Sequence, residues 1–197
     1  MQTAHFRRIL YSISFMCLAL APAAMANQVV NGGFEDFPDF TGWTVNDPSG
    51  FTLVGHDPAF AHSGNNKAFL GATGLLGTLS QNVMTSAGTG YTLSFFLAND
   101  GGAPPNEFDV FWNGVEIFSE VNAPHNPSYT NFTFSVVGGA GASTPLVFQY
   151  RNDADFFRLD DVSVGVPDTG STLWMALPVV GALVILDRSV RRRRIFA

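Results

Sequence analysis

Apolar and polar residues alternate with a period of two along several short stretches of the chain. Between positions 131 and 136, Phe132, Phe134 and Val136 alternate with polar residues, and positions 91–98 repeat the pattern. This is the period of a β-strand that buries one face. Helical periodicity is not convincing anywhere in the body of the chain. The pattern therefore predicts an all-β domain.

Further short strands are expected between clusters of Gly, Pro, Asn and Ser. Their ranges are 51–54, 68–71, 75–83, 107–112, 115–118, 146–151 and 156–164. Many short strands at this spacing are typical of a β-sandwich.

The dipeptide Asn113-Gly114 predicts a two-residue hairpin turn, because both turn positions require a positive φ. The turn sets the register of the strands on either side of it. It predicts three facing pairs: Trp112 with Val115 and Val110 with Ile117 on an apolar face, and Phe111 with Glu116 on the opposite face.

The last expected strand changes phase in its middle. Phe157 and Leu159 share one phase, whereas Val162 and Val164 share the other, so we expect a β-bulge at positions 160–161. Both residues there are aspartates, and two adjacent carboxylates at such an irregularity are suited to a cation.

The first 26 residues have the features of a signal peptide. Arg7 and Arg8 precede an apolar run over positions 9–20, and Ala24-Met25-Ala26 gives the small-x-small pattern that signal peptidase cleaves. We therefore expect cleavage after Ala26 and export of the mature chain.

The C-terminal segment predicts a short membrane-spanning helix. Positions 173–186 contain no charge, and a helix of fourteen residues is about 21 Å long against a hydrocarbon core of about 30 Å. The basic tail over 188–194 includes Arg191, Arg192, Arg193 and Arg194, which favour a cytoplasmic C-terminus in the inner membrane. The alternative is a buried helix followed by a solvated tail.

The remaining body, positions 27–165, is strongly acidic. It contains three basic residues, Lys67, Arg151 and Arg158, against fourteen acidic ones, a net charge of −11. Such a surface repels nucleic acid. The body also lacks cysteine, which excludes disulfides and a thiol nucleophile, and its length suits one domain.

Several segments in order resemble the signatures of galactose-binding-like jelly rolls, a group that includes carbohydrate-binding modules. The resemblance covers essentially the whole of positions 27–164. The segments are 31–35 (NGGFE), 41–43 (TGW), 61–64 (AHSG), 79–83 (LSQNV), 90–95 (GYTLSF) and 157–162 (FRLDDV).

The resemblance implies one structural calcium ion. In such families the carboxylate of the Gly-Phe-Glu segment meets a carboxylate of the Leu-Asp-Asp-Val segment, which nominates Glu35 with Asp160 or Asp161. Backbone oxygens near positions 63–67 would complete a shell of hard ligands. The alternative is that Glu35 caps a turn and the two aspartates are solvated at a sheet edge.

Four aromatic residues are candidates for stacking on sugar rings: Trp43, Trp112, Tyr129 and Tyr150. The alternative is that they belong to the core, and for Trp43 and Trp112 this alternative is favoured, since Trp112 shares its face with apolar neighbours.

Catalysis has less support from the sequence. Glu107, Asp109, Glu116 and Glu120 flank the hairpin, and paired carboxylates hydrolyse glycosides when held at a defined separation. Alternating carboxylates on a strand are more often a solvated face, and no G-x-S-x-G nucleophile motif is present. We therefore expect a protein that is not an enzyme.

The five residues before the apolar tail form a motif: Val166, Pro167, Asp168, Thr169 and Gly170. Followed by an apolar span and arginines, the motif resembles the PEP-CTERM class of sorting signals in its VPDSG-type variant, with threonine in place of serine. This resemblance implies processing by an exosortase. The LPxTG signal of sortases is the alternative, but it requires leucine where this chain has Val166.

Together these features predict an exported protein with three parts: a signal peptide (1–26), a β-sandwich (27–165) and a sorting signal (166–197). It would be held transiently in the membrane, then released to the cell surface or extracellular matrix, where a non-catalytic jelly roll binds polysaccharide or packs among it. The alternatives are a secreted polysaccharide hydrolase that uses the acidic hairpin, and a purely structural surface protein.

Overall fold

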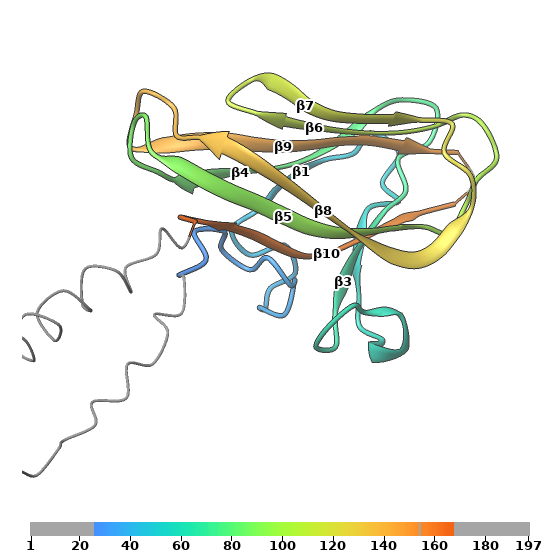
Figure 1. The fold of residues 1–197 in the computed structure, drawn as a ribbon. Helices are drawn as coiled ribbons and strands as arrows, with labels where there is room; N and C mark the ends of the chain where they lie inside the picture. Colours follow the sequence, from blue (N-terminus) through green and yellow to red (C-terminus); the bar gives the residue numbers. More distant parts are fainter. Residues whose placement is uncertain (1–25, 154, 168–197) are drawn as a thin grey trace, which may run out of the picture.

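Two five-stranded antiparallel sheets pack face to face in the computed structural model, which describes residues 26–153 and 155–167 (Figure 1). Sheet I has the order β1 (Thr44–Asn46), β4 (Gly77–Met84), β9 (Ser143–Asn152), β6 (Asn106–Trp112), β7 (Val115–Val121). Sheet II has the order β2 (Leu53–Gly55), β3 (Lys67–Leu70), β10 (Phe157–Gly165), β5 (Gly90–Asn99), β8 (Asn126–Val137). The expected all-β sandwich is confirmed.

The core lies between the sheets and is centred on phenylalanine. Alternate residues of β5 are buried, and the ring of Phe95 lies 5.3 Å from that of Phe148 in the opposite sheet and 6.1 Å from that of Phe108. Burying each such ring contributes about 1.5–3 kcal/mol. The period of two in the sequence is therefore the inward and outward alternation of a sandwich.

All the expected strands are present, with ends shifted by a few residues. One further strand, β1, was not predicted from the sequence. Its three residues, Thr44–Asn46, are too few to establish an alternation, and they form a strand only by pairing with β4.

The Asn113-Gly114 hairpin is confirmed, and one predicted pair is wrong. Trp112 pairs with Val115 and Phe111 with Glu116 as expected, but Val110 pairs with Phe118 instead of Ile117. A bulge between Val110 and Phe111 shifts the register by one residue, and the turn alone does not reveal it.

The predicted bulge in β10 is confirmed. Pairing with β5 shifts between Asp160 and Ser163, and Asp161 has a φ of 48°. Before the shift, Arg158 and Asp160 alternate with the core residues Phe157 and Leu159 and so lie on the outer face of sheet II, and the shift returns Val162 and Val164 to the core.

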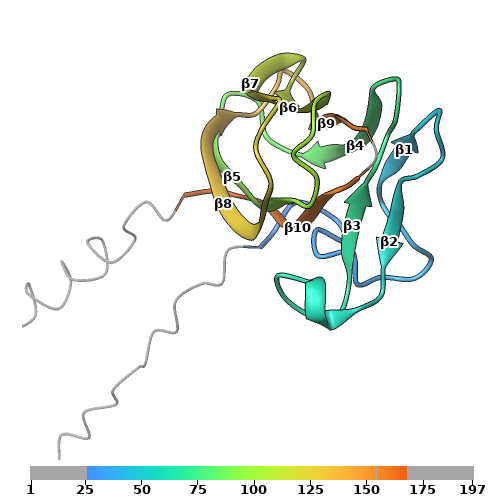
Figure 2. The same ribbon diagram turned by 90° about the vertical axis from the view of Figure 1, so that its right-hand side faces the viewer.

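The segment between β2 and β3, residues 56–66, folds over that outer face and is called the 56–66 loop below. It contains the short 3-10 helix η1 (Pro58–Phe60). In Figure 2 it lies below β2 and β3, on the side of the sandwich opposite β7.

The expectations for the two ends of the chain concern residues beyond the described ones. The signal peptide, positions 173–186, Asp168 to Gly170 and Arg191 to Arg194 all lie outside the described residues. Within residues 26–153 and 155–167, no helix has the length and hydrophobicity to span a bilayer.

Candidate functional site

An aromatic pocket of about 230 Å³ opens where the β1–β2, β3–β4 and β9–β10 connections meet. Its walls are Phe51, Gly71, Thr73, Asp155 and Phe156, and we call it the aromatic pocket. Phe51 leaves 54% of its surface exposed, which is unusual for a phenylalanine. An apolar hollow with a few polar groups at its rim is the usual form of a small-ligand site.

Phe156 is held in a fixed position at the back of this pocket. A Cβ on Gly71 would lie 2.5 Å from its ring, so glycine lets the ring lie directly against the end of β3. The ring of Phe69 meets it edge to face at 5.4 Å. Since two neighbours fix the ring, a ligand that stacks on it has little side-chain entropy to overcome.

Polar groups at the rim retain the capacity to bind hydroxyls. Asp155 accepts the backbone N–H of Phe156 through Oδ1 at 2.9 Å, and its other carboxylate oxygen makes no hydrogen bond among the described residues. Thr73 donates through Oγ1 to the carbonyl of Gly71 at 3.1 Å and keeps its acceptor lone pairs.

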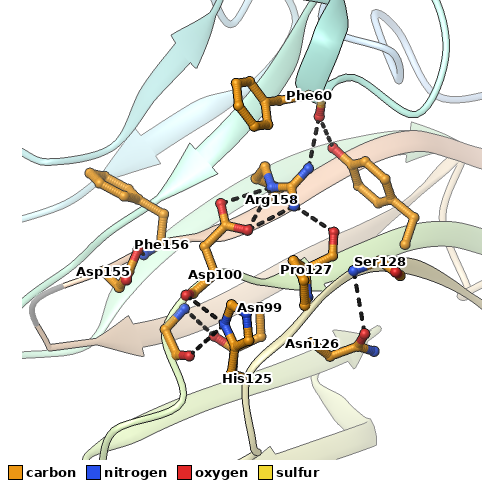
Figure 3. Close-up of polar contacts among 12 residues, drawn as sticks. Phe60, Asn99, Asp100, His125, Asn126, Pro127, Ser128, Asp155, Phe156 and Arg158 are labelled. Atoms are coloured by element: carbon orange, nitrogen blue, oxygen red, sulfur yellow. Dashed lines mark hydrogen bonds and ion pairs between the residues drawn. The ribbon is translucent and has the colours of Figure 1, made fainter.

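Arg158 fixes the loops beside the pocket (Figure 3). Its side chain is only 5% exposed and meets Asp100 with N–O distances of 2.7–2.9 Å. It also donates to the carbonyls of Phe60, at 3.0 Å, and Pro127, at 2.6 Å. One guanidinium therefore joins the 56–66 loop, the end of β5 and the start of β8.

The same network reaches the aromatic pocket through the backbone. The N–H of Asp100 donates to the carbonyl of Phe156 at 3.0 Å. Tyr129 places its ring 5.0 Å from the guanidinium of Arg158, and its hydroxyl donates to the carbonyl of Phe60 at 2.9 Å. Burial raises the pKa of Tyr129, so this phenol remains a donor.

The three carboxylates nominated for calcium all contact the 56–66 loop. Glu35 accepts the backbone N–H groups of Asn65 and Asn66 at 2.6 and 2.7 Å. Asp160 is buried and accepts the N–H of His62 at 2.8 Å. Asp161 meets the imidazole of His62 at 2.5 Å.

These carboxylates surround the backbone of Gly33. A Cβ there would lie 3.5 Å from Oδ1 of Asp161, 3.8 Å from Oδ1 of Asp160 and 3.8 Å from Cγ of Glu35. Their chemistry suits calcium, but the loop offers them N–H groups where backbone oxygens were expected. No group of three or more His, Cys, Asp or Glu side chains within the described residues is arranged to hold a metal. The calcium ion therefore stays a prediction.

The surroundings of Asp160 disfavour the charged form of its carboxyl group. Burial, and then the charge of Asp161, raise the pKa of Asp160 to about 6. The backbone N–H groups that it accepts only partly offset this cost. A buried carboxylate of this kind gains from any added positive charge.

The four aromatic residues nominated for sugar stacking are not available as open faces. Trp43, Trp112 and Tyr150 are buried, which agrees with the favoured core interpretation for the two tryptophans. Tyr150 bonds Thr52 at 2.8 Å, and burial raises its pKa to about 12. Tyr129 presents its ring to Arg158.

The sequence analysis did not identify Phe51 or Phe156. Phe156 stood at the start of an expected strand, where an apolar residue is normally core. The only signal was that Phe51, Gly71 and Phe156 each lie at the end of an expected strand, and their proximity depends on the three-dimensional arrangement of three connections.

The acidic residues of the hairpin are spread along it. Glu116 pairs with Phe111, four positions from Glu107, so the backbones of the two glutamates stand about 13 Å apart along β6. Glu107 and Asp109 lie two positions apart on one face of the same strand. The use of this hairpin by a hydrolase stays a hypothesis.

Comparisons with known proteins match the fold described above. No protein-family model and no curated sequence matches the chain. Among solved structures, TmCBM61 in complex with β-1,4-galactotriose is 19% identical, with a TM-score of 0.58, over 71% of this chain and 97% of that one. A xylan-binding domain from carbohydrate-binding module family 22 is 15% identical, with a TM-score of 0.52, over 75% and 99%.

An enzyme is also among the structural matches. The enzymatically active domain of tailspike protein 4 from bacteriophage CBA120 is 14% identical, with a TM-score of 0.53, but the match covers only 21% of that chain. At these identities the comparisons establish the jelly-roll fold of carbohydrate-binding modules.

Replacing Arg158 should weaken the fold far more than replacing the other paired arginine. Arg158→Met removes a buried cation that satisfies one carboxylate and two carbonyls, and we expect the free energy of unfolding to fall by about 3–5 kcal/mol. Arg151→Met breaks a more exposed pair with Asp153 and should change the free energy of unfolding far less. Urea denaturation measures both, and equal losses would contradict the role given to Arg158.

Asp160 should make stability depend on pH when calcium is chelated. Its folded pKa of about 6 lies above the ordinary value near 4, so its stabilising contribution is present at low pH and lost as the pH rises through 6. The thermal midpoint in chelator should therefore fall between pH 5 and 7.5. The fall should be smaller in Asp160→Asn.

Added calcium tests the predicted ion in the same assay. If Glu35, Asp160 and Asp161 bind it, calcium should raise the midpoint at pH 7.5, and Glu35→Ala should reduce this rise. A thermal midpoint at pH 7.5 that calcium leaves unchanged would contradict the predicted calcium site.

Proposed function

We propose that the protein is a non-catalytic glycan-binding protein of the cell exterior and that the aromatic pocket is its binding site. The observation that carries the proposal is the pair Phe51 and Phe156, two phenylalanine rings that line one pocket together with Asp155 and Thr73. Sugar rings combine apolar C–H faces with hydroxyls at their edges. A pocket of aromatic walls and a polar rim complements both.

The size of the pocket favours a short stretch of glycan. Its volume of about 230 Å³ is below the roughly 300–1,000 Å³ of a drug-sized site. The openness of Phe51 to solvent leaves room for the chain to continue beyond the pocket. The ligand is therefore expected to be a polysaccharide that enters with one part of its chain.

The structural matches support the class of ligand. One of the matched structures contains β-1,4-galactotriose and another is described as xylan-binding. These two glycans are accordingly the first probes for this chain, together with extracellular polysaccharide from the cells that produce it.

Removing either ring should abolish most of the glycan binding. We expect Phe51→Ala and Phe156→Ala each to weaken retention on the bound polysaccharide by at least about tenfold, because truncating a central aromatic contact costs about 2 kcal/mol or more. Affinity electrophoresis of the full chain in gels that contain galactan, xylan or native polysaccharide measures the effect.

The matched control is Phe37→Ala. Phe37 is 92% exposed and does not line the aromatic pocket, so its loss removes an equal apolar surface without touching the site. Retention that falls equally in all three variants would indicate nonspecific adhesion. No retention of the unaltered chain on any of the three glycans would leave only a structural packing role.

We further propose that the chain is exported through a signal peptidase site and sorted by an exosortase-type enzyme. The support is the signal-peptide pattern before Asn27 and the motif that begins at Val166. In the described residues, β10 ends at Gly165 and Val166 is 43% exposed just beyond it. A processing enzyme would therefore meet the start of the motif, Val166 and Pro167, exposed beyond the last strand.

The mature termini test the sorting proposal. Mass spectrometry of the protein isolated from its native cells should find an N-terminus at Asn27 and a C-terminus within Val166 to Gly170. Replacing Arg191 to Arg194 by alanine should prevent this processing while the domain still folds. An intact C-terminus at Ala197 in the mature protein would contradict the proposal.

A further inference from the structure

The outer face of sheet I carries two carboxylates, Glu107 and Asp109, beside a single arginine, Arg151. Glu107 and Asp109 alternate with the core residues of β6 and so point away from the core. On either side of Asp109, the register places Ser119 of β7 and Gln149 of β9 on the same face. These four side chains lie within three adjacent strands.

Asp109 is buried although it faces outward. It is only 3% exposed, and its Oδ1 has no hydrogen-bond partner among the described residues. A buried carboxylate oxygen without a partner is costly, because it has lost water and gained nothing in return. Such an atom requires an explanation in a folded protein.

The neighbouring Arg151 does not satisfy this oxygen of Asp109. Arg151 stands beside Glu107 in the ladder, but its guanidinium is engaged by Asp153 through Nε at 2.8 Å and Nη2 at 2.6 Å. The positive charge of Arg151 and the weaker effect of the negative charge of Glu116 both act on Glu107, and Oδ1 of Asp109 stays without a partner.

Glu107 and Asp109 stand two positions apart on one face of β6, so their carboxyl groups are neighbours. Two neighbouring carboxylates are stabilised by a shared proton or by a shared cation. The neutral oxygens of Ser119 and Gln149 on the same face favour the cation, because a shared proton would leave them unused.

We propose that Glu107 and Asp109 bind a hard divalent cation, Ca²⁺ or Mg²⁺, on the outer face of sheet I. The two carboxylates neutralise the charge of the ion, and Ser119 and Gln149 offer neutral oxygens that no side-chain hydrogen bond among the described residues uses. Water completes the shell, as is usual for both ions. This site lies on the sheet opposite the one that carries Asp160, and it does not depend on the proposed glycan binding.

Isothermal titration of the full chain with calcium chloride, and separately with magnesium chloride, tests the site. The unaltered chain should bind an ion that Asp109→Asn and Glu107→Gln no longer bind. Glu116→Gln removes the same charge from the same hairpin outside the site and should retain the binding event. Glu35→Ala should retain it too, because Glu35 lies in the other carboxylate cluster.

Stability provides a second measurement with a distinct sign. In chelator, Asp109→Asn should melt no lower than the unaltered chain, because it removes an uncompensated buried charge, but it should no longer be stabilised by the cation. Ion binding that persists in both Asp109→Asn and Glu107→Gln, or that Glu116→Gln loses equally, would overturn the proposal. So would an unaltered chain that binds neither ion, which would leave a shared proton between the pair.

Discussion

The burial of Arg158 on the outer face of β10 is the interaction on which the surface of this sandwich depends. A guanidinium without solvent must place every donor on an acceptor, and here the acceptors are Asp100 and the carbonyls of Phe60 and Pro127. Because those acceptors belong to the 56–66 loop, the end of β5 and the start of β8, Arg158 holds these three segments together. The backbone N–H of Asp100 also donates to the carbonyl of Phe156. The position of this wall of the aromatic pocket therefore depends on the ion pair of Arg158 and Asp100, which lies outside the pocket.

Asp160 imposes a similar constraint two residues along the same strand. Alternation with Phe157 and Leu159 turns it outward, but the 56–66 loop covers it, and its Oδ2 accepts the backbone N–H groups of His62 and Ser63. The sheet itself is built by the core of phenylalanines, while the two polar residues of β10 decide how the connections lie on it. Stability and the geometry of the candidate site are therefore coupled through one strand.

Alternation was sufficient to predict every strand except β1, and the bulge at 160–161, because both are local consequences of which side chains are apolar. It did not predict the pairing of Val110 with Phe118, since the bulge at Val110 leaves no mark in the apolar pattern. It also missed the aromatic pocket, because a phenylalanine at a strand end has the same local pattern whether it enters the core or a pocket wall. Trp43 and Trp112 were nominated by residue type, and tertiary packing buried them.

The central claim is that glycan enters the pocket between Phe51 and Phe156. Nuclear magnetic resonance of the isotope-labelled full chain, titrated with the polysaccharide fragments that it retains, tests the claim most directly. The account predicts shifts of the Gly71 and Thr73 amide signals and of the Phe156 ring signals, with those of the buried Tyr150 unchanged. Shifts confined to the outer face of sheet I, around Phe111 and Val147, with no change at Gly71 or Phe156, would contradict it.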